Sequence, residues 1–532
     1  MPSPPRFPTT IASVKQALLF LLAFGLAARP AFAQMLLADV QAVIAQAATR
    51  AAVVSPASVI AVVDREGYVL GVWSVNGATP ATAAFTNLVA NAIAKAGTAA
   101  FLSSDEHAFS SRTAGFIVQQ NFPPGIQNKP PGPLVGVNFS NLPFTDINRY
   151  KNPNIGFAPL PAPSSGVNGA AVPTPVTGGL AGTPGGVPLY KAGKLIGGVG
   201  VAGDGDGPAD ISPDIIRNPD VDEDVALAGQ IGFAPRRQIF GSDVTGDGIR
   251  FAYVSSTTSL GAVAAFGAIG VNFAAFPVQA SPAVAFPAIT IGGVTGELRI
   301  PIIADTTSAL APAIRLTATE VTNILAAAAN RARTTRAGIR LPRGRPMQVF
   351  ICVVNNPNTA GAPPVVLGSI CTSPDTTRFS WDVSIQKART AIFFSSDTRA
   401  FSSRTVGFMA QSTYPPGIVG TAPGIFLGLQ ERFSMFPNNF ANPLNGASYT
   451  NAPAINPNLP NGITIFPGGF PLYRDGVLIG AVGVSGDGID QDDIVAATGG
   501  SLFPAPAAIR ADHSLHRGAR LPYAKFPRNP AL

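Results

Sequence analysis

Four polar residues recur at matched positions in the two halves of this chain. The sets are Lys95, Thr98, Arg112 and Tyr190 in the first half, and Lys387, Thr390, Arg404 and Tyr473 in the second. Lysine and arginine pair with carboxylates through charge-assisted hydrogen bonds, and threonine or tyrosine can supply an oxygen to a metal. A structural role is the alternative: lysine pairs within the fold, threonine bonds back to its helix, and tyrosine fills the core.

The segments that carry these residues occur twice. Residues 93–126 and 385–418 are identical at 22 of 34 aligned positions, and residues 185–205 and 468–488 at 15 of 21. Two such blocks in the same order indicate a tandem duplication. We therefore expect both copies to bind similar ligands.

Each copy is expected to contain the same series of elements. A helix with one apolar face is predicted at 35–50 and again at 316–331 from its i, i+3, i+4, i+7 spacing. A hairpin is predicted at 58–75 and at 348–371, because both runs are rich in β-branched residues. The remaining predicted elements are the helix that carries the lysine, two strands around Gly193 or Gly476, a closing helix, and a tail in which 239–253 matches 509–523.

Two long insertions and a connector interrupt this pattern. The insertions span 127–184 and 419–467, are rich in Asn, Pro and Gly, and differ between the copies. Loops of this kind lie on the surface and often carry partner contacts. Residues 254–313 form an apolar, strand-prone connector, which we expect to pack between the copies. The two domains are therefore expected at 34–253 and 314–532.

The first 33 residues have the three-part pattern of a secretory signal peptide. Arg6 and Lys15 precede an apolar run at 17–28, and Ala31-Phe32-Ala33 precedes Gln34. We expect cleavage after the last of these alanines and a periplasmic or secreted mature protein. The apolar run is too short to span a bilayer, and no later segment predicts a transmembrane helix.

The composition argues against nucleic acid as a partner. The formal net charge is +7, and removal of the three basic residues of the signal leaves +4 without a cluster of Lys or Arg. Charged residues make up only 12% of the chain, whereas Gly (56) and Pro (51) are abundant, which is typical of long loops and extracellular proteins. The 46% hydrophobic content suffices for two sizeable cores.

The first copy carries the motif V-V-D-R-x-G-x-V-L within 61–70, and the second carries G-G-x-P-L-Y-x-x-G-x-L-I-G-x-V-G-V-S-G-D-x-x-x-Q-D within 468–493. The order of these motifs resembles the GlcG/HbpS-like family of haem-binding, or haem-degrading, domains. The resemblance implies an α/β domain of the α+β type in each copy, with an antiparallel sheet of about five strands flanked by helices. It also implies binding of haem or iron and a tendency to oligomerise. Because the chain is duplicated, we expect a monomer or low oligomer.

Under this resemblance, the shared lysines and arginines are candidates to pair with haem propionates, and the shared threonines and tyrosines to supply an oxygen to iron. Haem iron usually takes His, Cys, Met or Tyr as its axial ligand. His107 aligns with Arg399, so a ligand used by both copies cannot be this histidine. His513 and His516 could hold a metal if they lay on one helix, although an exposed turn is the alternative. The axial ligand stays open.

Other kinds of site have less support. The acidic loops at 204–206 and 487–490 lack the full spacing of a calcium loop, which favours hydrated turns. Cys352 and Cys371 flank a Pro/Gly-rich turn and are expected either to form a disulfide or to stay buried thiols. The sequence has no C-x-x-C-H motif, repeated Ser/His/Asp set, acidic dyad or phosphate-binding loop. Covalent c-type haem is therefore excluded.

The sequence thus predicts an exported protein that binds haem, or a related iron porphyrin, non-covalently. Two alternatives stay open. One is an envelope assembly module whose duplicated domains and loops bind protein partners, which the scarcity of strong iron ligands favours. The other is a haem-degrading enzyme that needs an external reductant.

Overall fold

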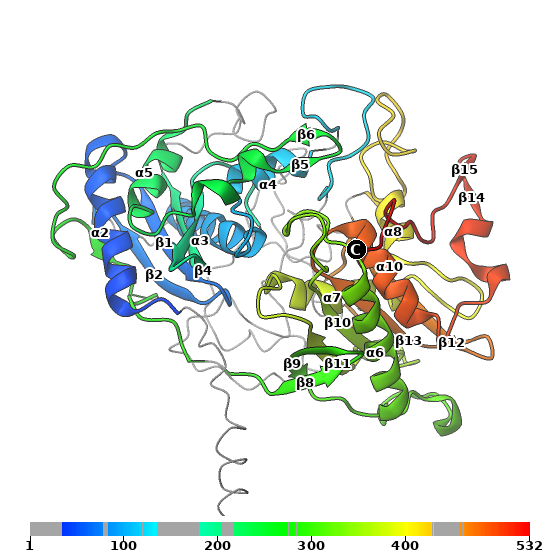
Figure 1. Ribbon diagram of the computed structural model, residues 1–532. Helices are drawn as coiled ribbons and strands as arrows, with labels where there is room; N and C mark the ends of the chain where they lie inside the picture. Colours follow the sequence, from blue (N-terminus) through cyan, green and yellow to red (C-terminus); the bar gives the residue numbers. More distant parts are fainter. Residues whose placement is uncertain are drawn as a thin grey trace, which may run out of the picture. The chain divides into compact units, whose positions relative to one another are not determined.

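The structure of the protein is a computed structural model (Figure 1). The predicted signal peptide, the acidic loop at 204–206 and most of both predicted insertions lie outside the described residues. The structure describes residues 34–77, 83–119, 121–135, 180–203, 218–274, 276–283, 285–427, 429, 458–459 and 462–532.

An antiparallel sheet of five strands forms the centre of the first copy. The predicted hairpin pairs β1 with β2, and β4 pairs with the other edge of β1. The strand order is β3-β4-β1-β2-β7. The strands are β1 (Val59–Asp64), β2 (Val69–Ser74), β3 (Gly186–Lys191), β4 (Lys194–Ala202) and β7 (Val271–Asn272).

The second copy is built around a corresponding sheet of six strands. Its order is β12-β13-β10-β11-β9-β8, so its first four strands match β3-β4-β1-β2 of the first sheet. The strands are β8 (Ala288–Ile291), β9 (Val294–Ile300), β10 (Phe350–Asn355), β11 (Val366–Cys371), β12 (Gly469–Arg474) and β13 (Val477–Ser485). Antiparallel sheets flanked by helices confirm the predicted α+β class.

Helices cover both faces of the second sheet (Figure 1). Along β10, Ile351 and Val353 share a core with α6 and α10, whereas Phe350, Cys352 and Val354 share another core with α7. Successive side chains of a strand point to opposite faces, so the sheet is buried on both sides. The principal helices are α2 (Leu37–Val54), α3 (Ala83–Leu102), α4 (Ser111–Ile117) and α5 (Val221–Gly229) in the first copy, and α6 (Ala318–Thr334), α7 (Phe379–Phe393), α8 (Ser403–Met409) and α10 (Ile489–Gly500) in the second.

Glycines allow α3 to lie close to β4. A Cβ on Gly198 would lie 2.3 Å from the carbonyl oxygen of Ala96, and a Cβ on Gly200 would lie 2.2 Å from that of Ala92. A side chain at either position would push the helix away from the strand. The predicted close approach of the backbone at this glycine-rich strand is therefore present, and its partner is the helix that carries Lys95.

The first helix is long and apolar enough to cross a membrane. Among the described residues, α2 alone meets this test of length and composition. Its predicted apolar face is completely buried, and the helix contacts α5 and β1. Packing within the fold therefore accounts for this face, which consists of Val40, Val43, Ile44 and Ala47.

Residues between the copies contribute strands to both sheets. β7 pairs with β2 of the first sheet, whereas β9 pairs with β11 of the second and β8 pairs with β9. The strand-prone connector predicted at 254–313 contains β7, β8 and β9. The connector is thus integrated into the two sheets by backbone pairing.

The tail of each copy packs beside the short helix α4 or α8. Thr113 Oγ1 donates to the carbonyl oxygen of Ala252 at 2.7 Å, and Thr405 Oγ1 donates to that of Pro522 at 2.6 Å. Each tail also contains a short hairpin, which precedes this contact in sequence. The tails are therefore integral parts of the two copies, as their sequence match predicted. The hairpin strands are β5 (Thr245–Gly246), β6 (Ile249–Arg250), β14 (Leu515–His516) and β15 (Ala519–Arg520).

The two cysteines are buried free thiols. They lie on neighbouring strands, but Cys352 is opposite Ser369 and Cys371 is opposite Phe350. Of the two predicted alternatives, the structure therefore has the free thiols. Burial raises the pKa of Cys352 to about 12, so this thiol stays protonated and unreactive at neutral pH.

Asp64 is a buried carboxyl at the end of β1, where the second copy has Asn355. Its Oδ1 accepts the backbone N–H of Tyr68 at 3.0 Å. Burial raises the pKa of Asp64 from 3.8 to about 7. Between these values the folded protein holds a proton that the unfolded chain has lost, so this contribution to stability is present at low pH and decreases as the pH rises through 7.

We expect Asp64→Asn to remove this pH dependence. At about pH 8 the variant should be more stable than the parent by about 2 to 4 kcal/mol, because each unit of pKa shift corresponds to about 1.4 kcal/mol. Urea unfolding from about pH 4 to 8 measures the effect. Asp247→Asn, in an exposed turn, is the control. The same slope in the parent and in Asp64→Asn would contradict the assignment.

Candidate functional site

The shared lysine of each copy is buried in an ion pair. Lys95 Nζ lies 3.0 Å from Asp222 Oδ2, and Lys387 Nζ lies 2.8 Å from Asp492 Oδ2. Lys387 also donates to the carbonyl oxygen of Val484 at 2.8 Å. Burial lowers the pKa of Lys387 and raises that of Asp492 to about 6. Each pair joins the lysine helix, α3 or α7, to the closing helix, α5 or α10.

A double glycine passes directly over this ion pair. The first glycine of each pair has a positive φ, +111° at Gly185 and +113° at Gly468, a conformation that favours glycine. A Cβ at either position would lie 3.1 Å from the lysine Nζ and less than 3 Å from the Cβ of the paired aspartate. The ion pair beneath thus explains the first glycine of the G-G-x-P-L-Y motif.

The shared arginines form a second contact with the closing helix. Arg112 Nε donates to Glu223 Oε1 at 2.7 Å, and its second nitrogen donates to Oε2 at 3.0 Å. Arg404 donates to Asp490 at 2.6 Å and also to Asp493. Paired hydrogen bonds between a guanidinium and carboxylates fix orientation as well as distance. They hold α4 to α5 and α8 to α10.

The shared threonines hold the segment that leads into the double glycine. Thr98 Oγ1 accepts the backbone N–H of Ala181 at 2.8 Å, and Thr390 Oγ1 accepts that of Thr464 at 3.1 Å. Thr390 also donates to the carbonyl oxygen of Gln386 at 2.8 Å. These hydroxyls therefore serve the same backbone position in both copies.

The shared tyrosines hold the loop that follows the lysine helix. The Tyr190 hydroxyl donates to the carbonyl oxygen of Ser104 at 2.6 Å, and the Tyr473 hydroxyl donates to that of Ser396 at 2.9 Å. Burial raises the pKa of both tyrosines. A neutral phenol that donates to a backbone carbonyl is therefore the form present at physiological pH.

All eight predicted site residues thus bond to protein groups, in matched ways in the two copies. The lysine and arginine of each copy converge on the first turn of the closing helix, whereas the threonine and tyrosine bind separate backbone segments. This arrangement agrees with the structural alternative, and contact of these residues with a ligand stays a prediction. The sequence reasoning missed their carboxylate partners, although the matched acidic starts of the closing helices were visible: Asp222, Glu223, Asp492 and Asp493.

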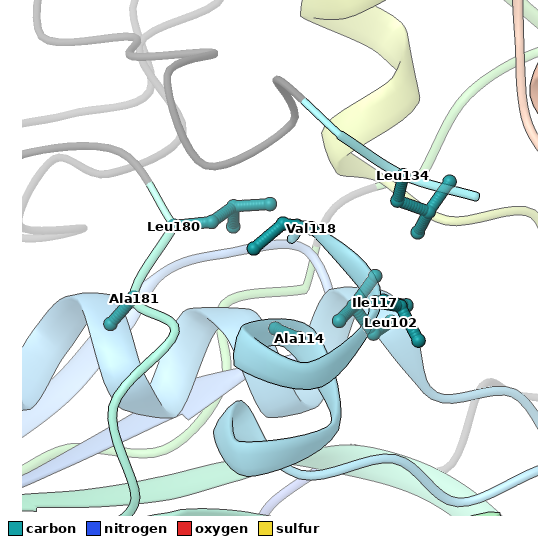
Figure 2. Close-up of a pocket in the computed structure, with 7 residues that line it drawn as sticks. All are labelled: Leu102, Ala114, Ile117, Val118, Leu134, Leu180 and Ala181. Carbon is teal, nitrogen blue, oxygen red and sulfur yellow. The ribbon is translucent and has the colours of Figure 1, made fainter. Parts of the chain in front are cut away.

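A small apolar cavity of the first copy is lined in part by Ala181, the residue whose N–H Thr98 accepts. Figure 2 shows side chains from α3, α4 and two loop segments around it. Its volume is about 10 Å³, which is roughly the room that one water molecule needs. Small-molecule pockets are usually about 300 Å³ or larger. The cavity is lined by Leu102, Ala114, Ile117, Val118, Leu134, Leu180 and Ala181.

Larger side chains occupy the corresponding place in the second copy. Phe394 stands at the position of Leu102, and Phe426 at the position of Leu134. The two phenylalanine rings lie 4.9 Å apart. The copies therefore share their buried polar contacts. They differ in the apolar residues that line the cavity in the first copy and in the residues at the matched positions of the second, which together we call the apolar layer.

The remaining candidates do not assemble into a metal site. Across the described ranges, no three His, Cys, Asp or Glu side chains form a group that could hold a metal ion. His513 lies in a 3-10 turn and His516 in β14, so they do not share one helix. His107 Nδ1 lies 2.8 Å from the carbonyl oxygen of Ile339. Asp487, from the second acidic loop, accepts the backbone N–H of Ile339 at 3.0 Å.

Comparison with known families classifies the second copy. Residues 316–500 match the family described as "Haem degrading protein HbpS-like". Over this range the second copy is therefore similar to the HbpS-like family, as its motifs indicated. The first copy has the same order of its first four strands and the same buried ion pair.

Two solved structures are similar to part of the chain. The structure entitled "Crystal Structure of PduOC:Heme Complex" is 20% identical, covers 36% of this chain and 96% of its own, and has a TM-score of 0.23. Klebsiella pneumoniae protein ORFY is 21% identical, covers 35% of this chain and 90% of its own, and has a TM-score of 0.23. No match was found among curated proteins.

We expect Gly468→Ala to destabilise the protein by about 2 to 4 kcal/mol, because its Cβ would lie against Val484, Asp492 and Lys387 in a strained conformation. Gly476→Ala is the matched control, since its φ is +83° but nothing lies within 4 Å of its Cβ. The control should cost about 1 kcal/mol. Urea unfolding measures both, and equal costs would contradict the role of the ion pair.

Proposed function

We propose that the protein binds haem, or a related iron porphyrin, non-covalently and is exported by a cleaved signal peptide to the periplasm or beyond. The match of residues 316–500 to the HbpS-like family carries this proposal, because the description of that family names haem. The first copy is included because it is identical to the second at 22 of 34 positions around the lysine helix.

A haem site needs an apolar slot, an axial ligand and polar groups for the propionates. The apolar layer beside α3 and α4 is the candidate for this slot. Its first-copy cavity has room for about one water molecule, so haem would enter there only if Leu134 and Leu180 moved away from Leu102. Thr98 lies one helical turn before Leu102 and therefore borders this layer.

The buried ion pairs make the lysines and arginines less suited to bind propionates. If Lys95 turned to a ligand, Asp222 would stay buried without its partner, and breaking such a pair costs roughly 3 to 5 kcal/mol. The threonine hydroxyls carry no charge and lose less when they exchange a partner. The proposal therefore assigns the direct ligand contact to Thr98 and Thr390.

Haem degradation is the second candidate, because the family description names that activity. It would consume oxygen and electrons from an added reductant such as ascorbate. Loss of the haem absorbance in bound protein under those conditions, but not without reductant, would distinguish degradation from storage or transport.

Haemin titration of the mature protein, from Gln34, is the primary test. We expect a sharp, shifted Soret band that saturates at one or two equivalents, because a specific site fills stoichiometrically. Albumin and buffer are the controls. Diffuse absorbance that does not saturate would contradict haem binding, and capture of an envelope protein would then be the function to test.

We expect Thr98→Val and Thr390→Val to weaken haemin binding by roughly fivefold each, the equivalent of about 1 kcal/mol for one hydrogen bond. Thr322→Val is the matched control, since this threonine also donates to the carbonyl oxygen four residues before it, in α6. Fluorescence quenching on titration measures the affinity. Unchanged affinity in both variants would remove the threonines from the site.

A further inference from the structure

An aromatic cluster borders the apolar layer of the first copy. The Phe122 ring lies 5.5 Å from that of Phe116 and 6.4 Å from that of Phe251, in both cases edge to face. Gly246 lies against Phe251, since a Cβ on this glycine would be 2.7 Å from the ring. Ile117, which lines the cavity in Figure 2, belongs to the same buried cluster. The first copy is therefore apolar throughout this cluster.

The second copy has polar rings in the same place. Tyr414 stands at the position of Phe122, whereas His516 and Leu521 stand at the positions of the glycine and of Phe251. The rings of Tyr414 and His516 lie 5.1 Å apart and nearly perpendicular, at 75°. The smaller Leu521 leaves room for the histidine ring. Aromatic packing is thus kept, but two side chains with hydrogen-bonding atoms provide it.

Both rings carry a buried polar atom without a protein partner. Within the part of the chain that the structure describes, neither the Tyr414 hydroxyl nor His516 Nε2 has a hydrogen-bond partner, and both atoms are shielded from solvent. Tyr414 as a whole is only 4% exposed. Burying such atoms unpaired costs stability, which the apolar residues of the first copy avoid. Both atoms are therefore available to a ligand that reaches them.

The surroundings of the pair indicate the kind of ligand. Met409 and Leu521 belong to the same buried cluster as Tyr414, and the Phe408 ring lies 5.4 Å from the tyrosine ring. Arg517, which is exposed, places its guanidinium 6.0 Å from the centre of that ring. Apolar walls, one or two iron-ligating atoms and a cation at the rim suit an iron porphyrin with carboxylates. A bare metal ion would need more ligands.

We propose that Tyr414 and His516 supply the protein ligand to haem iron, so that the second copy holds the iron. This inference rests on the proposed function and adds the iron-binding residues to it. Phenolate oxygen and imidazole nitrogen both serve as haem ligands in proteins. His516 lies beyond the residues 316–500 that match the family, so the ligand set includes the tail that follows the family domain.

The test compares haemin with iron-free protoporphyrin IX in the full mature chain and in two variants, His516→Gly and Tyr414→Phe. Each variant introduces the first copy's residue, and circular dichroism with thermal unfolding checks that it folds. We expect His516→Gly to lower haemin affinity about tenfold and to shift the Soret band, with protoporphyrin affinity unchanged. Tyr414→Phe should shift the haemin spectrum in the same selective way.

His513→Asp is the matched control, because it introduces the first copy's residue at an exposed histidine of the same tail. An unchanged haemin spectrum and affinity in both test variants would overturn the assignment. Equal loss of haemin and protoporphyrin would also overturn it, since the pocket rather than the iron ligand would then be affected. Failure of the parent chain to bind haemin would instead overturn the proposed function.

Discussion

A lysine and an aspartate, sealed together beneath a backbone that has no room for a Cβ, set the geometry of each copy. The pair joins α3 to α5 in the first copy and α7 to α10 in the second, and the double glycine carries the next strand across it. Loss of either charge would leave the other charge buried in the protein without compensation, which destabilises the fold. The ion pair therefore fixes the lysine helix, the closing helix and the strand after the double glycine relative to one another. The other shared polar contacts stabilise the same arrangement.

Elements with a regular pattern were predictable from the sequence. The apolar spacing of α2 and α6 and the β-branched runs of both hairpins depend on neighbours a few residues away. The partners of the polar residues were not predictable, because Lys95 and its aspartate are 127 residues apart and recurrence looks the same for a ligand contact and a structural one. The burial of these side chains against protein partners in the structure favours the structural role. Tyr414 was not among the candidates, because the first copy has Phe122 at its position, and His516 was a candidate only together with His513 on one helix.

Comparison of the two matched halves separates two kinds of constraint within one chain. The buried lysine–aspartate pair and the backbone contacts of the shared threonine and tyrosine occur in both copies, because each sheet and its helices need them. The apolar layer next to Thr98 and Thr390 differs: small residues leave a cavity in the first copy, and larger rings occupy the place in the second. Each copy therefore provides natural, fold-compatible substitutions with which to examine the other.

Strands β8 and β9 precede the second copy in sequence, yet they cover one edge of its sheet. Without them, β11 would present a row of unpaired N–H and C=O groups, which is a template for pairing with another chain. Loss of β8 and β9 would thus move the open edge of the sheet from the short, partly exposed strand β8 to the fully buried strand β11. The chain between the copies therefore protects the edge of β11 from pairing with another chain.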